Sequence, residues 1–415
     1  MTRSETSGTP EPSRQDHRGV GPAGNGSPWE VLRVFLRLGL TSFGGPVAHL
    51  GYFRTEFVER RKWLDDRGYA DLVALCQFLP GPASSQVGMA IGFMRARWIG
   101  ALLAWLGFTA PSAIALIVFG LGVSRWAGLA DSGALRGLKV AAVAVVAQAV
   151  WSMGRSLCPD RTRALLAVAT ALVTLSTPGS FGQIGAIAAS GLVGLWLVRL
   201  PVAPHEVNSR YAMTKTAGAI CLAVFFVLLL GLPVLAAVSG QSTLSLFDGF
   251  YRAGALVFGG GHVVLPLLQS TVVPGGAVSN SEFLAGYGAA QAVPGPLFTF
   301  AAYLGAVMHG PVHGVTGGVL FLLAIFLPAF LLVMGALPFW DALRQKRAVQ
   351  SALAGINAGV VGVLLAALYD PVWTSAIHGR TDFGLTVLVF GLLTFARTAP
   401  WIAVFMAGLV GQLML

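Results

Sequence analysis

Long apolar runs separated by short polar connectors dominate the chain from about residue 29 onward. The clearest runs are 98–121, 216–238 and 315–338. Each is long enough for a helix to cross the hydrocarbon core of a bilayer, which takes roughly 20 residues. The connectors leave no room for a sizeable water-soluble domain. The pattern therefore predicts an all-α polytopic membrane protein.

The second half of the chain repeats the first. The motif Phe-Gly-Gly occurs at 43–45 and again at 258–260, with an arginine seven residues before its first glycine in both copies. The motif Gln-x-x-Pro-Gly-Pro occurs at 77–82 and again at 291–296. Pairs such as Pro111 and Pro328 keep nearly the same offset, 214 to 217 residues, along the chain. Such a constant register indicates an internal duplication.

The duplication divides the chain into four parts. Residues 1–28, rich in Gly, Pro, Ser and charge, are expected to form a disordered tail and not a cleaved signal peptide. Residues 29–200 are the first repeat, 201–240 a linker with one transmembrane helix, and 241–415 the second repeat. Each repeat is expected to hold about six segments. Those of the first are 29–50, 68–94, 98–123, 140–153, 164–177 and 183–198.

The charges predict that the two repeats have inverted topology. With the N-terminus placed inside, the loops predicted inside carry 17 Lys and Arg, and those predicted outside carry five. Loop 51–67 has five cations, whereas its counterpart 266–281 has none. The exception is 124–139, with three cations on the predicted outer side. Inverted repeats that obey the positive-inside rule should show this contrast, because one extra crossing reverses the second copy.

Some segments are expected to be broken or re-entrant. Segment 68–94 has cations on both flanks and its counterpart 282–308 on neither, so each should enter and leave by one face. Both would break at Pro-Gly-Pro. The first segment of each repeat, broken at its two glycines, is expected either to span or to re-enter.

Breaks of this kind predict a substrate site. Freed backbone is tolerated at membrane depth only where it is buried or lines a wet cavity, and such breaks mark binding sites in transporters. A helix N-terminus carries roughly +0.5 charge and binds anions through its amides. Four such ends around one axis would offset about two negative charges, which suits a tetrahedral dianion. The alternative is that the breaks only kink helices or permit close packing.

The candidate substrate-binding residues follow from these breaks. His262 could donate a hydrogen bond to an anion or carry a proton, whereas His49 is expected at the membrane interface. The matched Arg37 and Arg252 either attract the anion or snorkel to the interface. The full set is Ser42, Gly44, Gly45, Pro46, Pro80, Gly81, Pro82, Ser84, Ser85, Gly259, Gly260, Gly261, His262, Pro294, Gly295, Pro296, Thr299, Arg37 and Arg252.

Composition and charge narrow the function further. The chain is 55% hydrophobic and 11% charged, with a net charge of +10. Cationic loops that fix the orientation of the chain in the membrane explain this net positive charge better than binding to nucleic acid does. The three cysteines, Cys76, Cys158 and Cys221, form no CxxC pair, so we expect no disulfide framework, no metal site and no cofactor. No carboxylate lies in the middle of a clean apolar run, and no phosphate-binding or hydrolase motif is present. An ATP-driven pump or a membrane protease is therefore unsupported.

In these motifs the chain resembles the chromate ion transporter family, in its long two-domain form. The resemblance rests on Phe43-Gly44-Gly45-Pro46, Pro80-Gly81-Pro82, Phe258-Gly259-Gly260-Gly261-His262 and Pro294-Gly295-Pro296. It implies a transporter of the bacterial inner (plasma) membrane that exports chromate and confers resistance to it. We expect a secondary transporter, driven by membrane potential or proton motive force. A carrier of sulfate or another oxyanion is the alternative, and an integral membrane enzyme acting on a phosphorylated lipid is a remote one. Whether the chain forms a homodimer is left open.

Overall fold

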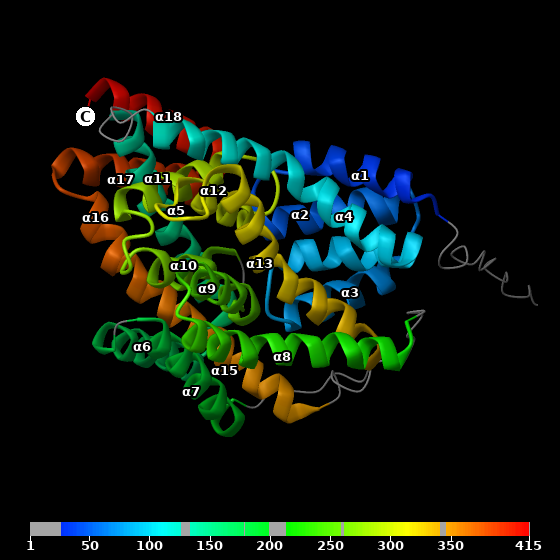
Figure 1. Ribbon diagram of the computed structural model, residues 1–415. Coiled ribbons are helices and arrows are strands. Elements are labelled where there is room, and N and C mark those ends of the chain that lie inside the picture. The colour runs from blue at the N-terminus through cyan, green and yellow to red at the C-terminus, as the bar shows by residue number, and fades with distance from the viewer. Residues whose placement is uncertain are drawn as a thin grey trace, which may run out of the picture.

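The chain folds into helices packed around one another (Figure 1). The computed structural model describes residues 26–125, 133–177, 179–198, 213–258, 261–340 and 346–414, and these ranges contain no strand. Five helical stretches in them are long and apolar enough to cross a membrane, and shorter apolar helices accompany them. The predicted all-α polytopic fold is confirmed. Most of the expected tail, up to residue 25, lies outside the described residues.

The helices of the first half end and begin at the residues that the motifs marked. Phe78 ends one helix and Ala83 begins the next, with Pro80-Gly81-Pro82 between them. The helices in chain order are α1 (Pro28–Thr41), α2 (Gly45–Arg54), η1 (Thr55–Arg60), α3 (Asp66–Phe78), α4 (Ala83–Arg125), α5 (Gly133–Leu157), α6 (Arg161–Ser176) and α7 (Ser180–Leu197).

The second half follows the same order after α8 (Lys215–Ser239), the predicted linker helix, which packs against α9 and α13. Ser279 and Glu282 form a reciprocal capping box that fixes the start of α11. The helices are α9 (Ser242–Leu256), η3 (Gly261–Val263), α10 (Val264–Val272), α11 (Asn280–Ala292), η4 (Leu297–Thr299), α12 (Phe300–Val307), α13 (Gly314–Ala336), η5 (Leu337–Phe339), α15 (Arg347–Ala367), η6 (Leu368–Trp373), α16 (Thr374–Ala376), α17 (Arg380–Thr394) and α18 (Pro400–Met414).

Helix α4 turns back on itself. Ala96 and Arg97 have non-helical dihedral angles, and Arg97 has a φ of +55°. The two arms of the turn come so close that a Cβ on Gly92 would lie 2.3 Å from the carbonyl oxygen of Gly100. In the second half, α12 and α13 make the corresponding approach, at Gly305 and Gly317. The break expected between segments 68–94 and 98–123 is therefore present, as the turn of a tight helical hairpin.

The last helices of each half are exchanged. Helices α6 and α7 pack on α15 of the second half, and α17 and α18 pack on α5 of the first half (Figure 1). Small residues permit this contact, because a Cβ on Gly137 would lie 2.1 Å from the carbonyl oxygen of Ala407. At the matched crossing, a Cβ on Gly355 would lie 2.3 Å from the carbonyl oxygen of Ser190. Close small-residue crossings of this kind hold membrane helices together, and here they interlock the two halves.

Candidate functional site

The first break, between α1 and α2, exposes the beginning of a helix. Gly44 and Gly45 have φ angles of +98° and +78°, a left-handed conformation that favours glycine. Pro46 follows in the first turn of α2, where its missing N–H costs nothing. No side chain caps this N-terminus. Its free amides are therefore available to a bound group.

The second break, between α11 and η4, has the same character. Helix α11 ends at Ala292, and Leu297 begins η4, which continues into α12. Gly295 lies between two prolines with a φ of +102°, as its first-half counterpart Gly81 does with +115°. No side chain caps the start of η4.

Each Pro-Gly-Pro break is bonded to the glycine break of the opposite half. The Gly81 N–H donates to the carbonyl oxygen of Val257 at 2.6 Å, and the Gly295 N–H donates to that of Ser42 at 2.9 Å. Ser42 and Val257 occupy matched positions before the two Phe-Gly-Gly motifs. The two hydrogen bonds are therefore equivalent under the duplication. The one between Gly295 and Ser42 holds the Pro-Gly-Pro break of the second half beside the glycine break of the first half.

A cavity of about 100 Å³ lies where these two breaks meet. Pockets for drug-sized ligands measure about 300–1,000 Å³, so this cavity suits a small ion. Both halves contribute to it, and none of the described residues that line it is acidic or a Lys or Arg. The lining residues are Gly44, Gly45, Pro46, Val145, Gln148, His262, Ala290, Gln291, Val293, Gly295, Leu297, Leu393 and Pro400.

Three helix beginnings reach the cavity. They belong to α2 at Gly45, to η3 and α10 at His262, and to η4 and α12 at Leu297. At roughly +0.5 charge each, three such ends offset about one and a half negative charges. The site can therefore hold an anion through backbone amides without a fixed cation.

Three polar side chains complete the lining. Nδ1 of His262 lies 2.7 Å from the Tyr287 hydroxyl, and in the tautomer in which that hydroxyl donates to Nδ1, Nε2 carries the ring proton and is a donor. Nε2 of Gln291 is buried and has no hydrogen-bond partner among the described residues. Gln148 comes from α5. Neutral donors of this kind can hydrogen-bond an oxyanion.

The predicted site residues divide into groups. Those that line the cavity are Gly44, Gly45, Pro46, His262 and Gly295. Those next to a lining residue in the chain are Gly261, Pro294 and Pro296. The Ser42 carbonyl oxygen accepts the Gly295 N–H, and Thr299 donates its hydroxyl to the Pro296 carbonyl oxygen at 2.8 Å. Those at the other Pro-Gly-Pro break, outside the lining, are Pro80, Gly81, Pro82, Ser84 and Ser85. Gly259 and Gly260 lie outside the described residues.

The two matched arginines do not line the cavity. Arg37 is exposed on α1. Arg252 forms an ion pair of 2.5 Å with Asp248, one turn earlier on α9. The Asp248 side chain is only 3% exposed. In this structure the Arg252 guanidinium therefore neutralises the buried Asp248 carboxylate.

This pair makes a stability prediction. We expect Arg252→Met to destabilise the protein by about 3–5 kcal/mol, because it leaves a buried charge without its partner. The double variant Asp248→Asn with Arg252→Gln should recover most of this loss. Thermal unfolding in detergent measures both. A double variant as unstable as Arg252→Met would show that the ion pair is not the cause.

Two polar lining residues, Gln148 and Gln291, were not among the predicted site residues. Gln291 begins the repeated Gln-x-x-Pro-Gly-Pro motif, so the repeat itself contained the signal. Gln148 is a lone polar residue within the apolar run of α5, and its repeat partner is apolar. Polar residues at membrane depth are costly and often functional, which is the signal that would have found it.

Comparison with known proteins assigns the family. The family model described as "Chromate transporter" matches residues 29–195 and again 244–412. The chain belongs to the chromate transporter family. Two copies of the family's unit thus cover most of this chromate transporter family member. Together with its apolar helices, this makes it a multi-pass membrane protein.

Curated relatives cover nearly the whole chain. The "Chromate transport protein" of Pseudomonas aeruginosa is 30% identical and is aligned over 88% of this chain and 86% of its own length. The protein of the same name from Cupriavidus metallidurans is 27% identical over 92% of each chain. A "Probable chromate transport protein" of Synechococcus elongatus is 26% identical over 82% of this chain and 83% of its own. No solved structure matches this family member significantly.

Proposed function

We propose that this protein is a secondary transporter that exports chromate across the bacterial inner membrane, with its N-terminus in the cytoplasm, and so confers chromate resistance. The observation that carries the proposal is the cavity between the halves, where three helix beginnings meet neutral donors and no acidic side chain. The names of the relatives supply the substrate. Sulfate, also a tetrahedral dianion, is the natural competitor.

The lining chemistry favours an oxyanion of this kind. Amides at helix beginnings are fixed donors that match several acceptor oxygens at once. Nε2 of His262 and the Gln291 side-chain amide add donors from the second half. Because the described lining has no Lys or Arg, the dianion would be held without a strong ion pair. A carrier must release its substrate, and neutral donors make release easier.

The duplicated breaks also suit a carrier. Each Pro-Gly-Pro break is bonded to the opposite half by one backbone hydrogen bond, at Gly81 and at Gly295. Rocking of one repeat against the other could exchange such bonds while the cavity stays at their interface. Alternating access in transporters with inverted repeats works in this way. The inverted orientation of the repeats is part of this proposal.

Export can run on the membrane potential. The cell interior is negative, so a dianion that leaves gains about 4.6 kcal/mol at 100 mV, from about 2.3 kcal/mol per charge. This supports a concentration ratio above about a thousandfold, at about 1.4 kcal/mol per decade. Protons need not be coupled, although His262 lines the cavity and is the residue that would couple them.

Everted membrane vesicles test direction and energy source together. With valinomycin and a potassium gradient directed inward, the lumen becomes positive, and we expect labelled chromate to accumulate without any pH gradient. Reversal of the potassium gradient should abolish the uptake. Uptake that needs a pH gradient or a counter-anion gradient would contradict potential-driven export and would make His262 the first residue to replace.

A further inference from the structure

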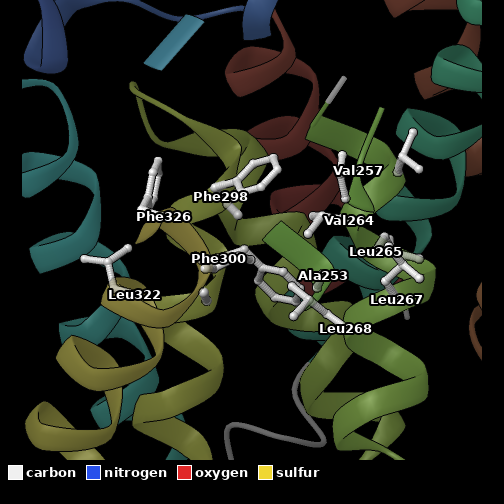
Figure 2. Close-up of a cluster of buried hydrophobic side chains, with 14 of the residues drawn as sticks. Ala253, Val257, Val264, Leu265, Leu267, Leu268, Phe298, Phe300, Leu322 and Phe326 are labelled. Atoms are coloured by element: carbon white, nitrogen blue, oxygen red, sulfur yellow. The ribbon is translucent and has the colours of Figure 1, made fainter. Parts of the chain in front are cut away.

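The two halves differ in the side chains around their helix breaks. At several matched positions the first half has a polar residue and the second half an apolar one. In the second half, side chains of α9, α10, α12, α13 and η4 form the apolar cluster drawn in Figure 2. The repeat register pairs five of the labelled residues with polar residues of the first half. Val257, Val264, Phe298, Phe300 and Phe326 correspond to Ser42, His49, Ser84, Gln86 and Thr109.

Three of these first-half residues, Ser42, His49 and Ser84, together with Ser85, form what we call the first-half polar cluster. All four side chains are buried, with exposed fractions of 0% to 2%. Nδ1 of His49 lies 3.3 Å from the Ser84 hydroxyl, and the His49 ring lies beside the Ser42 backbone. His49 was expected at the membrane interface, and the structure instead packs it edge-on to the ring of Phe108.

Two polar atoms of this cluster have no partner. Among the described residues, the Ser42 and Ser85 hydroxyls are buried without a hydrogen bond. Buried polar atoms in proteins are almost always satisfied by protein, water or ligand, because leaving them unpaired is costly. The second half shows that apolar side chains are compatible with the same fold at the positions matched to Ser42, His49 and Ser84, whereas Ser85 is matched by the polar Thr299 (Figure 2). Packing alone therefore does not account for the polar cluster.

The cluster adjoins the cavity between the halves. The Ser42 carbonyl oxygen accepts the N–H of Gly295, which lines the cavity, and Gly44 lines it two residues further along the chain. The Ser42 backbone therefore joins the cluster to the wall of the cavity.

The donors of the cluster favour an anion over a cation. Ser84 and Ser85 lie in the first turn of α4, where amides have no intrahelical partner and the helix end is positive. His49 and the serine hydroxyls add neutral donors. The cluster contains no carboxylate that would hold a cation.

We propose that the first-half polar cluster is a second oxyanion position, which the tetrahedral dianion enters from the cavity on its way across the membrane. This inference rests on the proposed transport function. The position is closed in this structure, since its four side chains are buried. The apolar cluster of the second half keeps the matched route shut. Transport therefore uses the cavity between the halves as the binding site and the first-half polar cluster as a transit position, not two equivalent sites.

The test compares transport with binding in the purified chain. His49→Val introduces the residue found at position 264, and Ser85→Ala removes an unpartnered hydroxyl. Each should lower the rate of labelled chromate uptake into proteoliposomes about tenfold or more, the effect of losing one hydrogen bond to a charged group. Equilibrium binding of chromate to the cavity should change by less than about twofold, because the lining is intact. His49→Gln keeps an N–H donor and should transport nearly as fast as the parent.

Thr174→Val is the matched control. Its hydroxyl is also buried and unpartnered, but it lies on α6, outside both positions. We expect this variant to transport like the parent, and an equal loss would overturn the inference. Parental rates in His49→Val and Ser85→Ala would overturn it too, as would a loss in His49→Gln as large as in His49→Val. If the proposed function itself fails, the parent chain transports no chromate, which separates the two outcomes.

Discussion

Gly45→Val is expected to abolish chromate transport while the protein still inserts into the membrane. Nothing lies within 4 Å of a Cβ built on Gly45, and this residue lines the cavity. Its isopropyl group would therefore occupy the space in which the anion approaches the amides of α2. Uptake of labelled chromate into everted vesicles measures the effect, with the amount of membrane-inserted protein as reference.

Gly276→Val controls for backbone strain in this experiment. Gly276 also has a positive φ, +69°, and no atom within 4 Å of a Cβ, but it is exposed in the connection between α10 and α11. A β-branched residue in the left-handed region costs about 1–2 kcal/mol at either site. Gly276→Val should thus transport like the parent. Wild-type transport by Gly45→Val would reject the anion site at this cavity.

A cysteine in each of two matched loops should react from opposite sides of the membrane. Cys76, Cys158 and Cys221 are first replaced by alanine, and the test sites are Arg67→Cys and Gly275→Cys, both at exposed positions. The positive-inside rule puts the cation-rich loop 51–67 in the cytoplasm and loop 266–281 outside. In intact cells, an impermeant thiol reagent should label only Gly275→Cys. In everted vesicles it should label only Arg67→Cys.

Equal labelling of both cysteines from one side would reject the inverted arrangement of the repeats. Transport of the anion would then have to be explained without alternating access between inverted halves. Solubilised protein, in which both sites are open to the reagent, gives the reference for full labelling.

The repeats and the helix breaks could be predicted because glycine and proline act locally. Gly44, Gly81 and Gly295 adopt positive φ angles that other residues rarely accept, so the motifs themselves mark where helices stop. The register between the halves then paired the breaks. The constant offset between the motifs required no knowledge of packing.

Contacts between distant segments could not be predicted in this way. The exchange of α6 and α7 onto α15 depends on glycines such as Gly194 and Gly355, which in sequence look like any other small residues. A break between residues 94 and 98 was expected, but the close approach of Gly92 to Gly100 across it was not. Both features are set by tertiary packing, which overrides local preference.

The side chains of the site show the same division. His49 precedes a charged loop, so the sequence indicated the interface, but short α2 folds it beneath α4. The partner of Arg252 was within reach of the sequence, because Asp248 lies four residues earlier on one helix face. The three-dimensional meeting of Gln148 with Gln291 was not, since α5 and α11 lie far apart in the chain.

Uptake of labelled chromate into liposomes that contain the purified chain and no other protein tests the central claim most directly. With an imposed potential that makes the lumen positive, we predict saturable uptake that sulfate inhibits and that the Gly45→Val protein lacks. Uptake no faster than in protein-free liposomes, or uptake that Gly45→Val leaves unchanged, would contradict the account.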